Sequence, residues 1–327
     1  MTVSLRPALV FVAALFTLVA TTNVARLTVP ALSVRAASNI ALAERPGADY
    51  YLAHDRGGHL DHHVLYHGTD AEAIEHLKRA DILFVGTSRL MFALRSRVVT
   101  PWAEQHGLRY YALGFGHRDG DEWVRELIER HDLRPQLVVT NIDGFFARRN
   151  SAWANRGRRD SAFGARQAQL EGEIGHQTRR VMQRLIPNWL DVYGRPGMSF
   201  GNEFIAYRSR INGVWSISSW PPATGSAPAA DYGAAEVGPR VATAARDFKA
   251  QLDRRGARLI LTHVPTPDAT GDNPVALGTL LGVPAVGLDV DGLTSHDGSH
   301  LSEESAVTWS RRVTGDLTPY LSSLRPR

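Results

Sequence analysis

The stretch that decides the fold is ADILFVGTSR, residues 80–89. Four apolar residues run directly into Gly86, Thr87 and Ser88, and an Ala- and Leu-containing segment follows. This order predicts a buried strand, a tight turn and a helix. Ser88 would lie at the carboxyl end of the strand, where open α/β sheets bind ligands. N–H groups at the start of the helix could then stabilise an oxyanion, although a serine there more often only caps the helix.

Further along the chain, apolar runs alternate with segments of helical periodicity. The runs lie at residues 108–114, 136–143, 257–263 and 284–290, and the helical segments include residues 122–131, 237–255 and 303–320. Alternation of this kind predicts parallel strands joined by right-handed crossovers. We therefore expect an α/β fold, a flavodoxin-like three-layer sandwich with a five-stranded parallel sheet.

The chain of 327 residues divides into three parts. Residues 1–26 contain an apolar run flanked by Arg6 and Arg26, which predicts an N-terminal membrane helix acting as a signal anchor, with a cleaved signal peptide as the alternative. Residues 27–68 are expected to form a stalk and an irregular, histidine-containing segment. Residues 69–327 would form the α/β domain. Either reading of the N-terminus predicts that the main domain lies outside the cytoplasm. The signal anchor also predicts a single-pass protein of the cell membrane.

One long insertion is expected within this domain, at about residues 145–232. It contains an amphipathic segment at residues 165–185 and three tryptophans, Trp189, Trp215 and Trp220. A long insertion is commonly a lid or a partner-binding surface. Alternatively, the tryptophans only pack the insertion onto the domain.

Composition excludes some classes of protein. The net charge of +4 is spread along the chain without zinc-finger spacing or a long Lys/Arg tract, so nucleic acid is not an expected partner. The chain has no cysteine, which excludes disulfide bonds and thiolate metal sites.

A cluster of histidines precedes the domain, at His54, His59, His62, His63 and His67. Imidazole is a common metal ligand, and His59, His63 and His67 would share one face of a helix. The stretch lacks the glutamate that a zincin motif places after its first histidine. We expect local packing roles for these histidines and no metal site.

A second polar motif, SHDGSHLSE at residues 295–303, follows the last strand. Asp297 and His300 are three residues apart in a loop, and Ser302 can cap the final helix. The carboxylate could hold the imidazole Nδ1–H and leave Nε2 as a base, or the two side chains could form only a capping turn. The strands that lead to Ser88 and His300 end at one edge of a doubly wound sheet, so the three side chains could meet there.

The motifs Gly86-Thr87-Ser88 and Asp297-Gly298-Ser299-His300-Leu301 resemble the first and last blocks of SGNH (GDSL-type) hydrolases. The resemblance implies that Ser88 is a nucleophile, His300 its base and Asp297 the residue that orients the base. It also implies an oxyanion hole made by the Ser88 N–H, Gly114 (with Gly116 as the alternative) and Asn141. The family's Gly-x-Asn-Asp block reads Val139-Thr140-Asn141-Ile142-Asp143 here, so its glycine is missing.

The segment around residues 78–89 is similar to the exported, membrane-anchored branch of this family, which includes polysaccharide O-acetylation and teichoic-acid D-alanylation proteins. That similarity implies a serine esterase or O-acyltransferase acting on acyl groups, with acetyl as the expected group, of a cell-envelope glycan. It implies no cofactor, and a polytopic membrane acyltransferase as a possible partner. The alternative is a non-catalytic SGNH-like protein for glycan binding or assembly.

Overall fold

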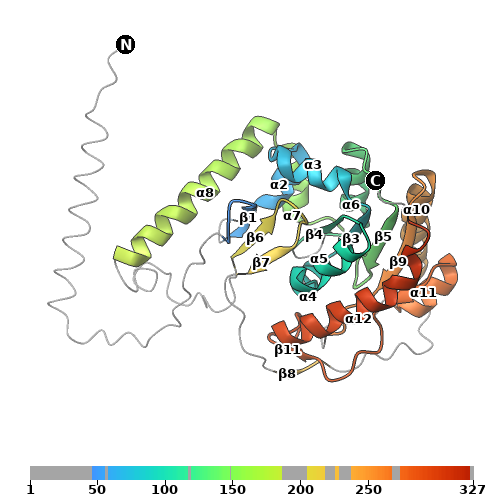
Figure 1. Cartoon of the computed structure of the whole chain (residues 1–327). Coiled ribbons are helices and arrows are strands. Elements are labelled where there is room, and N and C mark those ends of the chain that lie inside the picture. The colour runs from blue at the N-terminus through green and yellow to red at the C-terminus, as the bar shows by residue number, and fades with distance from the viewer. Residues whose placement is uncertain are drawn as a thin grey trace, which may run out of the picture.

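The computed structural model describes residues 46–55, 58–116, 119–147, 149–185, 205–217, 225–227, 237–266 and 273–324 (Figure 1). The expected signal anchor at residues 1–26 lies outside these ranges, as do Trp189 and Trp220. Within them, every helix is too short or too polar to cross a membrane.

Five parallel strands form the central sheet, in the order β10-β9-β5-β3-β4. Their bounds are β3 (Ile82–Gly86), β4 (Tyr110–Gly114), β5 (Leu137–Asn141), β9 (Arg258–Thr262) and β10 (Ala285–Val286). Counted in chain order this is 2-1-3-4-5, the order of flavodoxin-like sheets. The predicted α/β fold with a five-stranded parallel sheet is therefore confirmed.

The last strand is shorter than the run at residues 284–290 suggested. Strand β10 ends at Val286 because the chain turns away at Gly287, which has a φ of +69°. A side chain at that position would meet Val313 of the final helix at 2.2 Å, so only glycine fits there.

Helices cover both faces of the sheet. One face packs against α4 (Ser88–Ala93), α5 (Ser96–Gln105) and α12 (Glu303–Leu321). The other packs against α3 (Ala71–Arg79), α6 (Asp121–Arg130), α10 (Pro239–Arg254) and α11 (Pro274–Leu281). Neighbouring strand residues point to opposite faces, so Phe84 joins the first cluster and Val85 the second. The sheet and its two helical layers make a three-layer sandwich.

An antiparallel sheet replaces part of the irregular segment expected before residue 69. Its order is β2-β1-β6-β7, with bounds β1 (Tyr50–Asp55), β2 (Gly58–His59), β6 (Ala206–Ser209) and β7 (Trp215–Ile217). Helix α2 (Leu60–His67) follows β2. Strand β1 forms because tyrosine and leucine favour a pleated, buried surface, and its partner β6 supplies the other half of that surface.

The insertion shares the antiparallel sheet with the segment before residue 69. It contributes β6 and β7 to the antiparallel sheet, together with α7 (Ala152–Arg159), α8 (Ala162–Leu185) and β8 (Gly225–Ser226). Strand β8 pairs with β11 (Thr294–Ser295), next to the motif at residues 295–303. Trp215 is 2% exposed and packs in the core, as expected if it holds the insertion on the domain.

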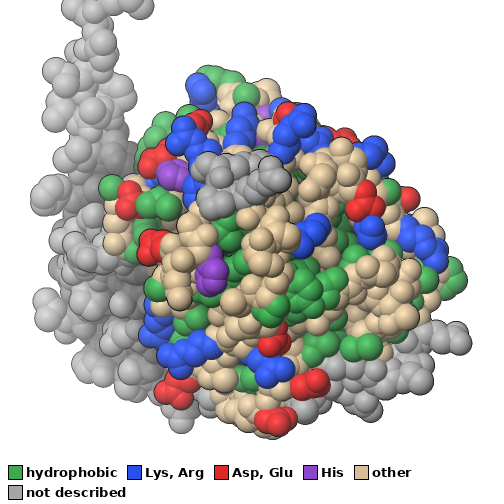
Figure 2. Space-filling model, turned by 45° about the vertical axis from the view of Figure 1, so that its right-hand side comes forward, with side chains coloured by type: hydrophobic (Ala, Val, Ile, Leu, Met, Phe, Trp, Pro, Cys, Tyr) green, Lys and Arg blue, Asp and Glu red, His purple; other side chains and the backbone are tan. Residues whose placement is uncertain are grey.

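Charged side chains of both signs are interspersed on the face of the molecule drawn in Figure 2. Apolar side chains lie between them over the centre of that face. A face of this kind does not present the single-sign electrostatic footprint of a nucleic-acid site.

Candidate active site

Ser88 is the first residue of α4, directly beyond the end of β3. The residue that caps this helix is Thr87, whose Oγ1 accepts the Arg89 N–H at 3.4 Å. The capping role considered for Ser88 is thus filled by its neighbour. Gly86 allows the close approach of the next strand, because a Cβ there would lie 3.0 Å from the Asn141 Cβ.

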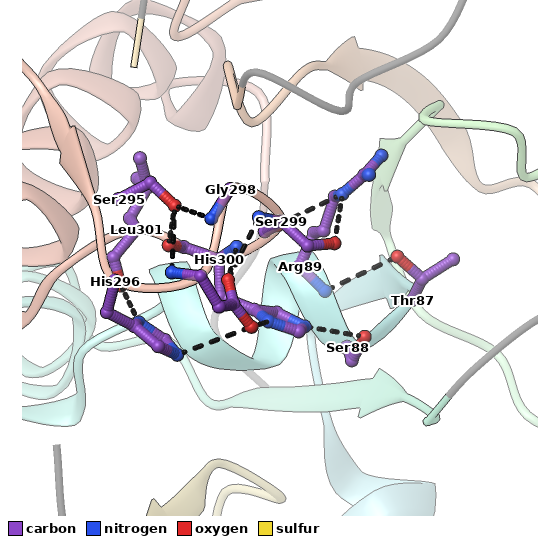
Figure 3. A network of polar contacts seen from close by, with 10 residues as sticks. Thr87, Ser88, Arg89, Ser295, His296, Gly298, Ser299, His300 and Leu301 are labelled. Carbon is purple, nitrogen blue, oxygen red and sulfur yellow. Dashed lines mark hydrogen bonds and ion pairs between the residues drawn. The ribbon is translucent and has the colours of Figure 1, made fainter. Parts of the chain in front are cut away.

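Asp297 and His300 lie in the loop between β11 and α12. Figure 3 shows how His300 meets Ser88. His300 Nδ1 lies 2.7 Å from Asp297 Oδ2, and His300 Nε2 lies 3.0 Å from Ser88 Oγ. Asp297 Oδ1 accepts the N–H groups of Ser299 at 2.9 Å and of His300 at 2.7 Å, which fixes the loop. The structure therefore brings together the three side chains that the sequence placed in one site.

The contacts define a direction for proton transfer. Burial acts to raise the pKa of Asp297, but the hydrogen bond and charge of His300 outweigh it and hold this pKa below its usual range. Asp297 is thus an anion that can accept the Nδ1–H of His300, which leaves Nε2 to take a proton from Ser88. The His300 ring rests on Phe92, with their centroids 4.2 Å apart.

Asn141 lies at the end of β5, beside β3 in the sheet. Its Oδ1 accepts the Val264 N–H at 2.9 Å, which assigns the orientation of the amide. Its Nδ2 is buried and has no hydrogen-bond partner among the described residues. An orphaned buried amide donor at this rim is what an oxyanion hole requires.

Gly114 ends β4 and pairs in register with Gly86. A Cβ on it would meet Met91 Sδ at 2.5 Å, so packing against α4 already explains this glycine. Its carbonyl accepts a hydrogen bond from Arg208. At Gly116, a Cβ would lie 2.0 Å from the His59 ring. The donor role expected of Gly114, or of Gly116, stays a prediction.

Arg89 and Asp143 form a buried ion pair that the sequence analysis missed. The side chain of Arg89 is 8% exposed and that of Asp143 is 0% exposed. Arg89 Nε also donates to the Ser299 carbonyl at 3.0 Å and to its hydroxyl at 3.3 Å, as Figure 3 shows for Arg89 and Ser299. One side chain therefore connects the loops that follow β3 and β5 to the loop that carries Asp297 and His300.

A second histidine, His296, lies against the site and was also missed. Its ring stacks on His300, with centroids 5.7 Å apart and planes 15° apart. Its Nε2 lies 3.6 Å from Asp297 Oδ2, and burial lowers its pKa. His296 is therefore a mainly neutral ring at neutral pH that supports His300 from the side.

Histidines of the cluster at residues 54–67 make contacts between helices. His63 Nε2 lies 2.8 Å from Asp160 Oδ2, and His67 Nε2 lies 2.8 Å from the Gly157 carbonyl, so both attach α2 to α7. His59 precedes α2 as its N-cap residue and does not share the helical face predicted for it.

Among the residues that the structure describes, two groups of side chains have ligand atoms close enough for a metal ion. The first group is His59, Asp61 and His62. The Asp61 carboxylate lies 3.0 Å from Arg208 and 3.1 Å from His62 Nδ1. His62 Nε2 in turn lies 2.6 Å from Asp119. Asp61 is thus already matched by cationic partners. The second group is His296, Asp297 and His300, the acid–base part of the site described above.

Comparisons with known proteins add one distant likeness. A scan of protein-family models gave no match, and neither did a search of curated proteins. Among solved structures, the chain matches "a putative acylhydrolase" from Bacteroides fragilis with 12% identity and a TM-score of 0.33. The match covers 76% of this chain and 93% of that one. Similarity at this level does not transfer an activity to this chain.

Proposed function

We propose that this protein is an extracytoplasmic serine esterase or O-acyltransferase that acts on acyl, most simply acetyl, groups of a cell-envelope glycan. The observation that carries the proposal is the hydrogen-bonded series from Ser88 through His300 to Asp297. A serine, an imidazole and a carboxylate in this order are the parts of a nucleophilic acyl-transfer site.

In the proposed reaction, Ser88 Oγ attacks the acyl carbonyl while His300 Nε2 takes the hydroxyl proton. The tetrahedral oxyanion would be stabilised by the Ser88 N–H at the start of α4 and by the orphaned Nδ2 of Asn141. His300 then returns the proton to the departing alcohol, and an acyl-serine remains. Water or a sugar hydroxyl, deprotonated by His300, removes the acyl group and regenerates Ser88.

The glycan substrate, the membrane location and a polytopic acyltransferase partner are proposed from the family resemblance of the motifs around Ser88 and His300. The open position of the site is compatible with a polymer. The side chains of His300 and Asp297 are 14% and 33% exposed, so the reacting groups are reachable from solvent. Chemistry on a polymer chain needs access of this kind.

The test uses the full chain with a serine-reactive fluorophosphonate and a small acetyl ester. Ser88→Ala should abolish labelling, and His300→Ala should reduce labelling and turnover by orders of magnitude, because the nucleophile then lacks its base. Ser96→Ala, at the start of α5, is the matched serine control and should label like the parent. A folded parent protein that neither labels nor turns over the ester would refute the proposal and favour the glycan-binding alternative.

A further inference from the structure

Helix α8 turns polar side chains toward the protein. His176 is fully buried, and its Nε2 lies 2.7 Å from the Tyr207 hydroxyl of β6. Glu173 Oε1 accepts the N–H of Leu52 in β1 at 3.3 Å. Gln169 lies on the same side of the helix, since residues seven positions apart share a helical face. These contacts fix which side of α8 faces the antiparallel sheet.

The outward side of α8 carries an apolar row. Phe163, Leu170 and Ile174 are 77%, 60% and 57% exposed. They are the most exposed large apolar side chains among the residues that the structure describes. Spacings of seven and eleven residues place all three within about 40° of one another around the helix.

This arrangement is the reverse of a normal surface helix, which points its apolar stripe at the core and its polar residues at water. A row of three large apolar residues on one exposed face marks an interaction surface. The polar contacts of His176 and Glu173 leave no option of rotating the helix to bury that row. The partner must therefore come from outside the described structure.

Two observations identify a lipid bilayer as the occupant. The first is the path of the chain, since β1 touches α8 and begins at Tyr50, while the apolar N-terminal segment ends near residue 26. Only residues 27–49 separate β1, which contacts α8, from the N-terminal segment that is expected to lie in the membrane. The second is charge. Exposed arginines lie close in sequence to Phe163, namely Arg156 and Arg159 of α7 and Arg166 of α8.

We propose that α8 lies on the surface of an anionic bilayer, with Phe163, Leu170 and Ile174 in the headgroup boundary. Arg156, Arg159 and Arg166 would then lie near lipid phosphates. Helices with apolar and basic faces bind membrane interfaces in this way. The contact fixes how the domain sits over the membrane and holds the insertion at the lipid surface. It rests on the membrane location proposed above, and it does not depend on the activity of Ser88.

The experiment uses single-cysteine variants of the full chain, which has no native cysteine. Leu170→Cys and Ile174→Cys carry an environment-sensitive nitrobenzoxadiazole label on the outward side of α8. Val275→Cys, on α11 and 48% exposed, is the matched control at an exposed apolar position. Each protein is reconstituted into vesicles of phosphatidylcholine with phosphatidylglycerol, with and without lipids that carry doxyl groups, and measured in mild detergent for comparison.

The expected result is a blue-shifted emission and a several-fold loss of quenching by aqueous iodide at positions 170 and 174, with no change at 275. Arg166→Gln, at an exposed arginine of α8, should weaken the effect in these vesicles but not in pure phosphatidylcholine. Labels at 170 and 174 that stay as quenchable as the control would overturn the proposal. Shielding from iodide without quenching by lipid-borne doxyl groups would also overturn it, because the chain or a second copy, and not lipid, would then cover the row.

Discussion

The ion pair between Arg89 and Asp143 should position the loop that carries Asp297 and His300. Two variants can separate this effect from the contribution of the pair to folding stability. Arg89→Met removes the guanidinium from a carboxylate that is 0% exposed. Breaking a buried pair by removing one partner costs about 3–5 kcal/mol of unfolding free energy. The same change removes the hydrogen bonds from Arg89 Nε to the carbonyl and hydroxyl of Ser299.

Arg89→Met combined with Asp143→Val removes both charges and leaves apolar side chains in their place. Replacing a buried pair in this way is often neutral for stability, so most of the 3–5 kcal/mol should return. The link to Ser299 stays broken in the double variant. Because His300 follows Ser299 in the chain, we expect His300 Nε2 to be held less firmly at its 3.0 Å contact with Ser88 Oγ. A misplacement of about 1 Å can cost on the order of a hundredfold in rate.

Urea unfolding gives the stability of each variant, and kcat/KM on a small acetyl ester gives its activity. The single variant should lose both. The double variant should regain stability and still react about ten- to a hundredfold more slowly, mostly through kcat. If activity returns in step with stability, Arg89 acts only in folding and the positioning argument is wrong.

Three further outcomes are expected. Asn141→Ala should lower kcat about 10²–10³-fold by removing an oxyanion donor, and fluorophosphonate labelling rates that match the parent would contradict this. Burial acts to lower the pKa of His62, but hydrogen bonds to Asp119 and Asp61 outweigh burial and raise this pKa to about 9. The protonated His62 should therefore stabilise the fold by on the order of a few kcal/mol below about pH 6.5, and this stabilisation should be lost as pH rises through about 9. Urea titrations should show that slope in the parent and not in His62→Gln. Gly114→Ala should destabilise the fold by about 1–3 kcal/mol through its clash with Met91, and Met91→Ala should recover part of this loss in thermal unfolding.

The parallel sheet could be predicted from the sequence because each strand is a local apolar run that is buried on both faces. The strands β3, β4, β5 and β9 are each buried along nearly their whole length, which produces an unbroken hydrophobic pattern. The meeting of Ser88 with His300 could be inferred because each follows a strand of one sheet. In both cases a short motif contains the information.

Contacts between distant segments could not be predicted in this way. Strand β1 depends on β6, and the hydrogen bond from Arg208 to Asp61 spans 147 residues. No local pattern marks either one. The pair of Arg89 with Asp143 is of the same kind, since an arginine after a serine looks like an exposed helix residue until the loop after β5 is in place. Helix α11 was missed although its ends carry local signals, with Asn273 as its N-cap, Pro274 in its first turn and Gly282 after its last residue.

Arg208 explains why the insertion and the N-terminal segment belong to one folding unit. It is fully buried and donates to the Ala112 carbonyl at 2.8 Å and to the Gly114 carbonyl, at the carboxyl end of β4. A guanidinium at that depth needs a counter-charge, and Asp61 of α2 supplies it at 3.0 Å. The rim beside Ser88 is thus supported by β6 from the insertion and by α2 from the N-terminal segment. A chain shortened to begin at residue 69 would keep Ser88, Asp297 and His300, yet it would bury Arg208 without Asp61 and leave β6 without β1. We therefore expect a chain cut at the boundary suggested near residue 69 to be less stable than the full chain.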